Sequence, residues 1–144
     1  MKNNKGFTLI ELLVVISILG VLLALSVFGM QGARQSSRDG KRKADLEQIR
    51  SGLEMYRADC NAYPTTLGTI LKGTGTPSST CPTSNVYISS VPVDPTSTTR
   101  KYAYSSAGTT YTLCTALEQA PSPAMDITGC GSCTATCNYK VTNP

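Results

Sequence analysis

Two features of this sequence could carry chemistry: a single carboxylate inside a long apolar run, and six cysteines further along the chain. Glu11 is the only formally charged residue between Phe7 and Met30. A carboxylate inside a bilayer is costly unless it reaches the interface or meets a cation, so we expect Glu11 to have a partner. The positive end of its own helix would supply part of that compensation. Histidine is absent, which excludes acid-base and metal sites that need an imidazole.

The even number of cysteines in a small domain predicts a disulfide framework and an oxidising compartment. Many pairings are open to six cysteines, and the sequence does not choose among them. Our predicted pairing joins Cys60 with Cys81, Cys114 with Cys137, and Cys130 with Cys133. Closing these loops would stabilise a head that is poor in aromatic residues.

Cys130-Gly-Ser-Cys133 also has the C-x-x-C spacing of a redox pair, and with Cys137 it could hold a metal or a cluster. A reactive thiolate needs a lowered pKa, which a helix N-terminus commonly provides. This segment instead lies between glycines and threonines near the end of the chain. Structural disulfides are therefore the favoured interpretation of these cysteines.

The apolar run at residues 7–30 would be roughly 36 Å long as a helix, which is enough to cross a bilayer. Residues 1–6 form a short polar leader in which Lys2 and Lys5 favour an inside location. A conventional secretory signal peptide is a weaker interpretation, because the run is too long and lacks an A-x-A-like site. A plain single-pass anchor would leave the leader and Glu11 unexplained.

An amphipathic pattern follows at residues 31–60, where apolar residues recur at spacings of three and four. These residues are Leu46, Ile49, Leu53 and Tyr56. No proline occurs before Pro64, so residues 7–60 are predicted to form one helix of about 54 residues. Glycines between Gly20 and Gly32 should make that stretch its weakest part.

Residues 61–144 are predicted to form a loop-rich globular head, which gives an α+β fold with a small antiparallel sheet packed on the helix. The expected strands are Lys101–Ser105, Thr110–Leu117 and Thr136–Thr142, with a weaker one at Val86–Val91 and a short helix at Thr66–Lys72. Alternation within the second strand puts Tyr111, Leu113 and Leu117 on one face, ready to pack against the apolar stripe. The chain thus divides into a leader (1–6), a membrane and assembly segment (7–30), an amphipathic segment (31–60) and a head (61–144).

Five cations follow the apolar run: Arg34, Arg38, Lys41, Arg42 and Lys43. Counting charges alone would place this side inside the cell, against the orientation that the leader favours. Nucleic-acid binding is not expected, because no aromatic residues interleave with these cations and Asp39 interrupts them. We predict a solvated or filament-contacting helix face.

The segment Gly6-Phe7-Thr8-Leu9-Ile10-Glu11, after a basic leader and before an apolar run, resembles the processing site of type IV pilins and type II secretion pseudopilins. The resemblance implies that a prepilin peptidase cuts between Gly6 and Phe7 and methylates the new amine of Phe7. It also implies that Glu11 guides assembly. The Phe7 amine of a neighbouring copy would then be the cation that Glu11 needs.

A second resemblance, to the major pseudopilin of type II secretion, extends into the head. It rests on Ala44-Asp45-Leu46, Tyr63-Pro64-Thr65, Pro92-Val93-Asp94-Pro95 and Tyr102-Ala103-Tyr104. The chain departs from that family where Thr96 and Ser97 replace Trp-Gly and where Phe28 replaces a frequent proline.

That family implies a calcium-binding head. After residue 60 the acids are Asp94, Glu118 and Asp126, too few for a full oxygen cage. We expect no cofactor, and Glu118 and Asp126 are the residues that calcium would use.

These observations predict a structural subunit of a type IV pilus-like filament, not an enzyme. The alternative is the major pseudopilin of a type II secretion system, and a remote alternative is a secreted or membrane-anchored thiol oxidoreductase. Expected partners are other copies of the chain, prepilin peptidase, an inner-membrane assembly platform and, before assembly, the lipid bilayer. The expected location is the cytoplasmic membrane with the C-terminus outside, followed by an extracytoplasmic filament.

Overall fold

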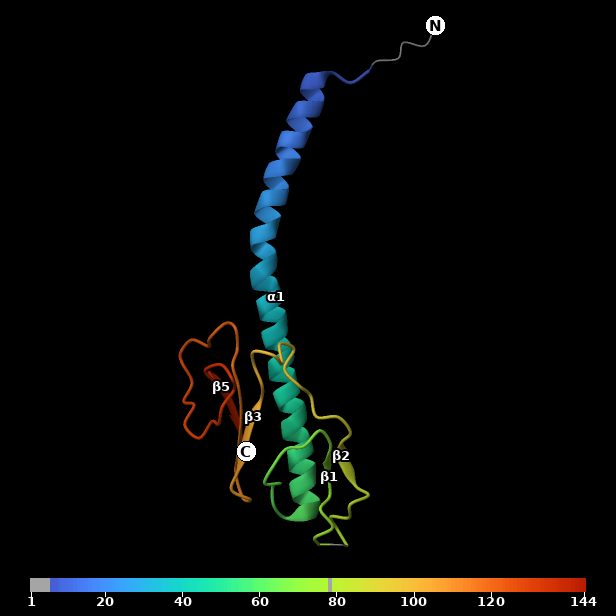
Figure 1. The fold of residues 1–144 in the computed structure, drawn as a ribbon, viewed down its shortest axis with the longest axis vertical. Coiled ribbons are helices and arrows are strands. Elements are labelled where there is room, and N and C mark those ends of the chain that lie inside the picture. The colour runs from blue at the N-terminus through green and yellow to red at the C-terminus, as the bar shows by residue number, and fades with distance from the viewer. Residues whose placement is uncertain (1–5, 78) are drawn as a thin grey trace. The chain divides into compact units, whose positions relative to one another are not determined.

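The computed structural model describes residues 6–77 and 79–144, and it divides into two compact units. The first ends at Ser36 and the second is Ser37–Pro144. Lys2 and Lys5, the predicted inner flank, lie outside the described residues. The α+β class predicted from the sequence is confirmed, with one helix and five short antiparallel strands in the described chain (Figure 1).

Helix α1 (Leu9–Cys60) has 52 residues, close to the predicted length. It ends where expected, because Asn61 adopts a left-handed backbone with φ of 60° and Pro64 follows three residues later. The helix is continuous through Gly20 and Gly32, so these glycines do not interrupt it.

In the first unit, the helix exposes apolar side chains on every face, and Phe7, just before the helix, is 90% exposed. Nothing in the described chain covers the apolar part of α1, which is long and apolar enough to cross a membrane by length and composition. A helix that is apolar all round has to be buried by lipid or by protein.

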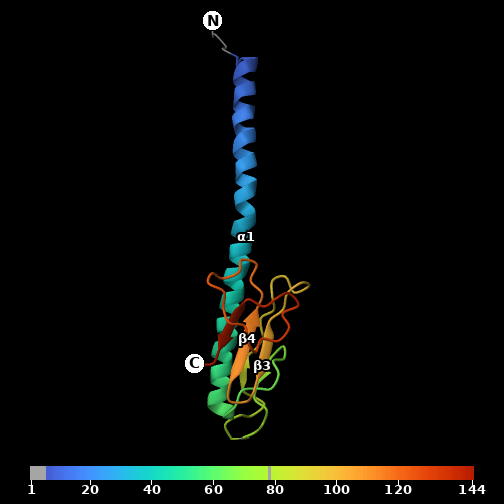
Figure 2. The ribbon, with the colours of Figure 1, turned by 90° about the vertical axis from the view of Figure 1, so that its left-hand side faces the viewer.

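The second unit contains five strands in two antiparallel sheets. They are β1 (Leu71–Lys72), β2 (Val86–Ile88), β3 (Ala103–Ser106), β4 (Tyr111–Thr115) and β5 (Tyr139–Thr142). Strands β1 and β2 pair with each other, and β3, β4 and β5 form a second sheet with β4 in the centre. Figure 2 shows β3 and β4 lying alongside the part of α1 that belongs to this unit.

The three strands predicted for the second sheet are confirmed, as is the weaker strand that became β2. The helix predicted at Thr66–Lys72 is wrong, because its last two residues form β1 instead. Leu71 pairs with Ile88 and its side chain is buried in the core. A seven-residue helix interrupted by Gly68 could not offset the cost of nucleation, whereas pairing with β2 buries the leucine.

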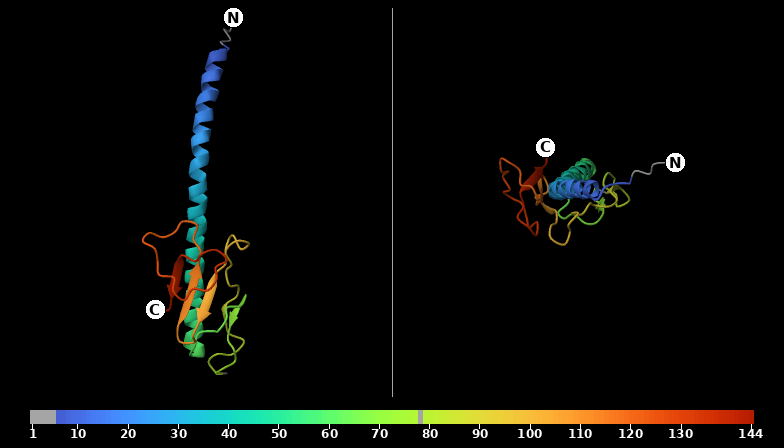
Figure 3. Two further views of the ribbon diagram at one scale, coloured as in Figure 1. Left: turned by 60° about the vertical axis from the view of Figure 1, so that its left-hand side comes forward. Right: turned by 90° about the horizontal axis from the view of Figure 1, so that it is seen from above.

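The main core lies between α1 and the face of the β3-β4-β5 sheet that carries Tyr111 and Leu113. As predicted, these two side chains contact the apolar stripe that begins at Leu46. Leu117 is buried too, although it lies beyond the end of β4. Cys114 alternates onto the opposite face, where it joins a second buried cluster with Ala103 and two further cysteines. Figure 3 shows the orange strands of the sheet lying along the part of α1 that belongs to this unit.

Two helix glycines should respond to alanine in opposite directions. A Cβ on Gly52 would lie 2.3 Å from Ile88 Cγ1, whereas one on Gly40 would meet no described atom within 4 Å. Gly52→Ala should therefore cost about 1 to 3 kcal/mol through overpacking. Gly40→Ala, the matched control, should stabilise the protein by about 1 kcal/mol through helix propensity. Denaturant unfolding measures both, and equal stabilisation by the two variants would contradict the close approach of β2.

Candidate functional site

The predicted cleavage bond, Gly6–Phe7, lies in a short non-helical segment just before α1. An added Cβ on Gly6 would meet no atom of residues 6–77 and 79–144 within 4 Å, and the Phe7 side chain is almost fully exposed. A protease that needs an extended, uncovered peptide would find this bond accessible. Cleavage here and methylation of Phe7 remain predictions.

Glu11 closes a capping box at the start of α1. Thr8 precedes the helix, and its backbone N and its Oγ1 donate hydrogen bonds to Glu11 Oε2 at 2.9 and 2.8 Å. In return, the Glu11 backbone N donates to Thr8 Oγ1 at 3.3 Å. The two residues thereby satisfy orphan donors of the first helical turn. The spacing Thr8-x-x-Glu11 before an apolar run is itself the sequence signature of a capping box, so the sequence could have predicted this contact.

The capping box places both Thr8 hydrogen bonds on a single carboxylate oxygen of Glu11. Among the interactions within residues 6–77 and 79–144, the other oxygen, Oε1, accepts none. The carboxylate is therefore held in one orientation while keeping an oxygen available for a cation. Its assembly role remains a prediction.

Sequence reasoning missed a buried ion-pair network in the second unit. The Arg42 side chain is 0% exposed, and its Nε and Nη2 donate to the two oxygens of Asp94 at 2.8 and 3.1 Å. Its Nη1 donates to Asp39 at 2.7 Å and to Glu118 at 2.9 Å. Arg38 Nε also donates to Glu118, at 2.6 Å. The prediction of a solvated basic face is therefore wrong for Arg42.

The position of Arg42 explains its burial. It lies four residues before Leu46 and therefore continues the apolar stripe of the helix by one turn. A charge on such a stripe needs partners from the head, and Asp94 and Glu118 supply them. Asp39 also accepts the backbone N–H groups of Glu118 and Gln119 at 2.9 and 2.8 Å. The network thus fastens two head segments to α1.

Hydrogen bonding in this network lowers the pKa of two carboxyl groups, those of Glu118 and Asp94. Arg38, followed by Arg42, holds the pKa of Glu118 at about 2, below its usual value of 4.5. Burial opposes the charge of Asp94, but its bonds to Arg42 and Thr96 outweigh burial and lower its pKa. A carboxyl with a lowered folded-state pKa stabilises the fold above its unfolded pKa. The contribution of Glu118 is therefore complete above about pH 4.5 and is lost as the pH falls towards about 2.

The two residues named for calcium lie in different ion pairs. Glu118 is bonded to Arg38 and Arg42, while Asp126 accepts from Lys140 Nζ at 3.0 Å and from the backbone N of Thr128 at 2.9 Å. In the part of the chain that the structure describes, no cluster of three or more acidic or cysteine side chains is arranged to hold a metal. Each of these carboxylates already has a cationic neighbour.

The structure joins all six cysteines in three disulfides. The predicted Cys60–Cys81 bond is present. The predictions for the other four cysteines are wrong: the bonds are Cys114–Cys130 and Cys133–Cys137.

The pairing of β4 with β5 explains the error. Cys114 lies opposite Lys140, so Cys137 falls beyond the end of the ladder and is not the cross-strand partner of Cys114. The C-x-x-C pair, Cys130 and Cys133, is split between two bonds, so the described chain has no C-x-x-C disulfide for an oxidoreductase.

Removing one disulfide should destabilise the head more when that disulfide closes a longer loop. Cys60–Cys81 joins residues 21 apart and Cys133–Cys137 joins residues 4 apart. Replacing both cysteines of one bond by serine should lower the free energy of unfolding by about 3 kcal/mol for the first bond and about 2 kcal/mol for the second. Denaturant unfolding of the two variants measures the difference. Thiol titration of the wild-type chain purified without reductant should find no free thiol, and six free thiols would refute the framework.

Comparison with known families agrees with this architecture. Residues 1–27 match the prokaryotic N-terminal methylation motif, which defines the class as the pilin-like proteins. Residues 29–119 match type II secretion system protein G. The chain belongs to the type II secretion system protein G family, as the second resemblance in the sequence implied.

Individual relatives support the same family. The type II secretion system core protein G of Pseudomonas aeruginosa is 35% identical over 112 residues, which cover 75% of this chain and 78% of the relative. That of Aeromonas hydrophila is 35% identical over 98 residues, covering 65% and 68%. That of Dickeya chrysanthemi is 40% identical over 79 residues, and the match spans 52% of the relative's length. No solved structure matches the chain.

Proposed function

We propose that this chain is the major pseudopilin of a type II secretion system, the subunit that polymerises into the short filament of the secretion machine. The observation that carries the proposal is the protein G match over residues 29–119, which favours a secretion filament over the pilus expected first. The pilus interpretation names a broader class, and the relatives reported above are named as secretion proteins.

The proposed mechanism begins with storage in the membrane. The apolar part of α1 lies in the bilayer, with the leader on the cytoplasmic side and the C-terminus outside. Prepilin peptidase cuts after Gly6, and the amine of Phe7 becomes free for methylation. The accessible, non-helical position of this bond supports the cleavage step.

Assembly then replaces lipid with protein around the apolar helix. Large exposed apolar surfaces mark sites of contact with lipid or with other proteins, and the first unit exposes apolar side chains on every face. In the filament, Glu11 Oε1 would accept a hydrogen bond from the Phe7 amine of the neighbouring copy. Because an unpaired carboxylate in a low-dielectric core is costly, this pair would set the register between subunits.

The role proposed for the chain is structural, not enzymatic. All six cysteines are joined in disulfides, which supports a structural role in stabilising the head more than a redox role. The proposed partners are other copies of the chain, prepilin peptidase and the inner-membrane assembly platform, with no cofactor.

Deleting the gene in its host tests the secretion role. The proposal expects exoproteins to accumulate inside the cell envelope and to disappear from the culture fluid, while a plasmid copy restores their release. A plasmid copy carrying the control substitution Gly40→Ala should restore release equally well, because a Cβ at that position would meet no atom of the described chain within 4 Å. Unchanged exoprotein release together with the loss of long surface pili would support the pilus interpretation instead.

A further inference from the structure

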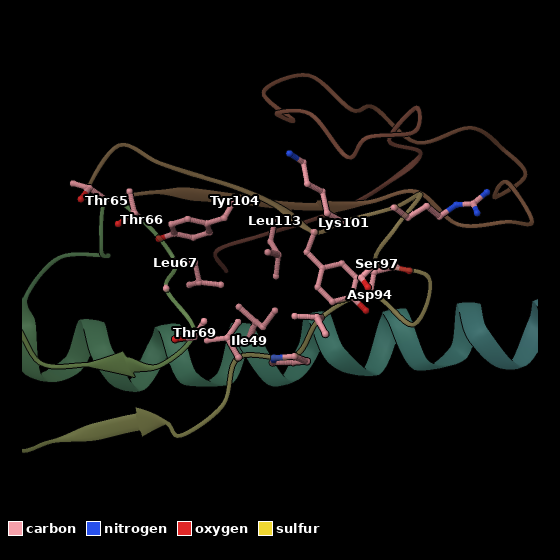
Figure 4. A pocket seen from close by; sticks show the side chains of 16 residues that line it. Ile49, Thr65, Thr66, Leu67, Thr69, Asp94, Ser97, Lys101, Tyr104 and Leu113 are labelled. Atoms are coloured by element: carbon pink, nitrogen blue, oxygen red, sulfur yellow. The ribbon is translucent and has the colours of Figure 1, made fainter.

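The head contains an apolar cavity that the proposed assembly of the N-terminal helices does not use. Its volume is about 580 Å³, and it opens between α1, the β3-β4 hairpin and the segments at residues 65–69 and 91–93. In Figure 4, Leu67, Tyr104 and Leu113 lie in the space between strand and helix, whereas Lys101 points away from the helix. The cavity therefore has an apolar interior and a charged edge.

The charge at that edge that has no ion-pair partner within the described chain is positive. Asp94 also lines the cavity, but Arg42 already neutralises it at 2.8 Å. With partners sought among residues 6–77 and 79–144, neither Arg100 nor Lys101 forms an ion pair. Arg100 Nε is buried and has no hydrogen-bond acceptor there. An occupant should therefore combine an apolar side chain with a carboxylate.

The loop at residues 120–128 has that combination. Met125 and Ile127 are 40% and 37% exposed, and Asp126 lies between them. Lys140 Nζ lies 3.0 Å from Asp126 Oδ2 and Thr128 donates to Oδ1, yet the Asp126 side chain is 72% exposed, so a second cation can approach this carboxylate from the solvent side. The loop carries no basic residue of its own.

The loop is also held in place, which reduces the entropy lost on binding. Thr128 N donates to Asp126 at 2.9 Å, Thr112 Oγ1 donates to Gly129 O at 3.0 Å, and the Cys114–Cys130 disulfide closes the end of the loop. Within the second unit, Figures 1 and 3 place this orange-red loop on a different side from the segments at 65–69 and 91–93. The loop does not occupy the cavity of its own chain.

We propose that the 120–128 loop of one copy docks into this cavity of a second copy. Met125 or Ile127 then lies on the apolar lining, and Asp126 lies near Arg100 and Lys101. A contact between two different surfaces of identical subunits can repeat from copy to copy, and where the rotation does not close into a ring it gives an open helical array. The inference rests on the proposed filament function and adds a head-to-head contact to it.

Photo-cross-linking in filaments of the full chain tests this contact. A photoreactive benzoylphenylalanine replaces Met125, and filaments are assembled from a mixture of isotopically light and heavy subunits. After irradiation, mass spectrometry should find mixed-isotope adducts between the probe and peptides containing residues 65–69 or 91–93. The same probe at Met55, an exposed apolar position on α1, should not give these adducts.

Two matched surface substitutions give an independent measurement. Val93 lines the cavity and is 69% exposed, while Val86 is exposed on β2 and does not line it. Val93→Glu should lower filament yield by about tenfold, because it places a carboxylate where Asp126 of the next copy would bind. Val86→Glu should leave the yield unchanged, and both variants should fold like the wild type.

Adducts to cavity peptides and a selective effect of Val93→Glu support the inference. Filaments whose Met125 probe reacts only within its own subunit, elsewhere on a neighbour or with another protein would overturn it and leave the proposed function standing. Equal yields from the two glutamate variants would also overturn it. If the wild-type chain forms no filaments, the proposed function fails together with the inference.

Discussion

Glu11→Gln should abolish filament assembly while leaving membrane insertion and cleavage after Gly6 largely intact. Glutamine can still complete a capping box with Thr8, so this substitution removes the charge and keeps the helix cap. Removing one partner of a charge pair in a low-dielectric core costs about 3 to 5 kcal/mol. Repeated at every subunit contact, that cost should stop polymerisation. Glu11→Ala should have the same effect on assembly and should weaken the cap as well.

The measurement compares sheared filaments with the membrane pool of subunits and scores processing in parallel. Ser17→Ala is the matched control, because it removes a polar side chain from the same helical segment. Within the described chain, Ser17 Oγ donates to the backbone oxygen of Val14 and to no other group. Normal filament yield from Glu11→Gln combined with poor yield from Glu11→Ala would show that Glu11 acts as a cap alone. Normal yield from both variants would make it a tolerated acid of the first turn.

Arg42→Met should destabilise the head by about 3 to 5 kcal/mol, because it leaves the buried carboxylate of Asp94 without its bidentate partner. Glu118 and Asp39 would lose a partner too. The neighbouring exposed substitution Lys41→Met should change stability by less than about 0.5 kcal/mol. Denaturant unfolding with the disulfides intact measures both variants.

The double variant Arg42→Met/Asp94→Leu provides a further check. Removing both charges avoids the uncompensated carboxylate, so the double variant should be more stable than Arg42→Met alone. If Arg42→Met lowered the free energy of unfolding by less than about 1 kcal/mol, the network would not hold the head to the helix as described.

The apolar stripe explains both the success and the main error of the sequence prediction. Leu46, Ile49 and Leu53 predicted the helix face on which the sheet packs, because burial of a periodic stripe dominates the packing. The same spacing of residues includes Arg42, but the sequence prediction put this charged side chain on a solvated or filament-contacting face, whereas it is buried. Asp39 lies only three residues before Arg42, but its partners from the head, Asp94 and Glu118, are distant in sequence, and no local pattern signals those contacts.

The cysteines show a different limit. Their number predicted the disulfides, but pairing depends on the register of β4 with β5 and on the path of the loop between them. A register difference of a few residues exchanges Cys137 for Lys140 opposite Cys114. At the N-terminus, by contrast, the capping box of Thr8 and Glu11 depends only on residues three apart, and such local contacts can be read from the sequence.

The central claim is that this chain is a processed, polymerising pseudopilin, and mass analysis of the N-terminal peptide from assembled subunits tests it most directly. The account predicts a mature chain that begins at Phe7, with a methylated amine, in both the membrane pool and the filaments. A mature start near residue 30, or a chain that retains Met1 in the filaments, would contradict it.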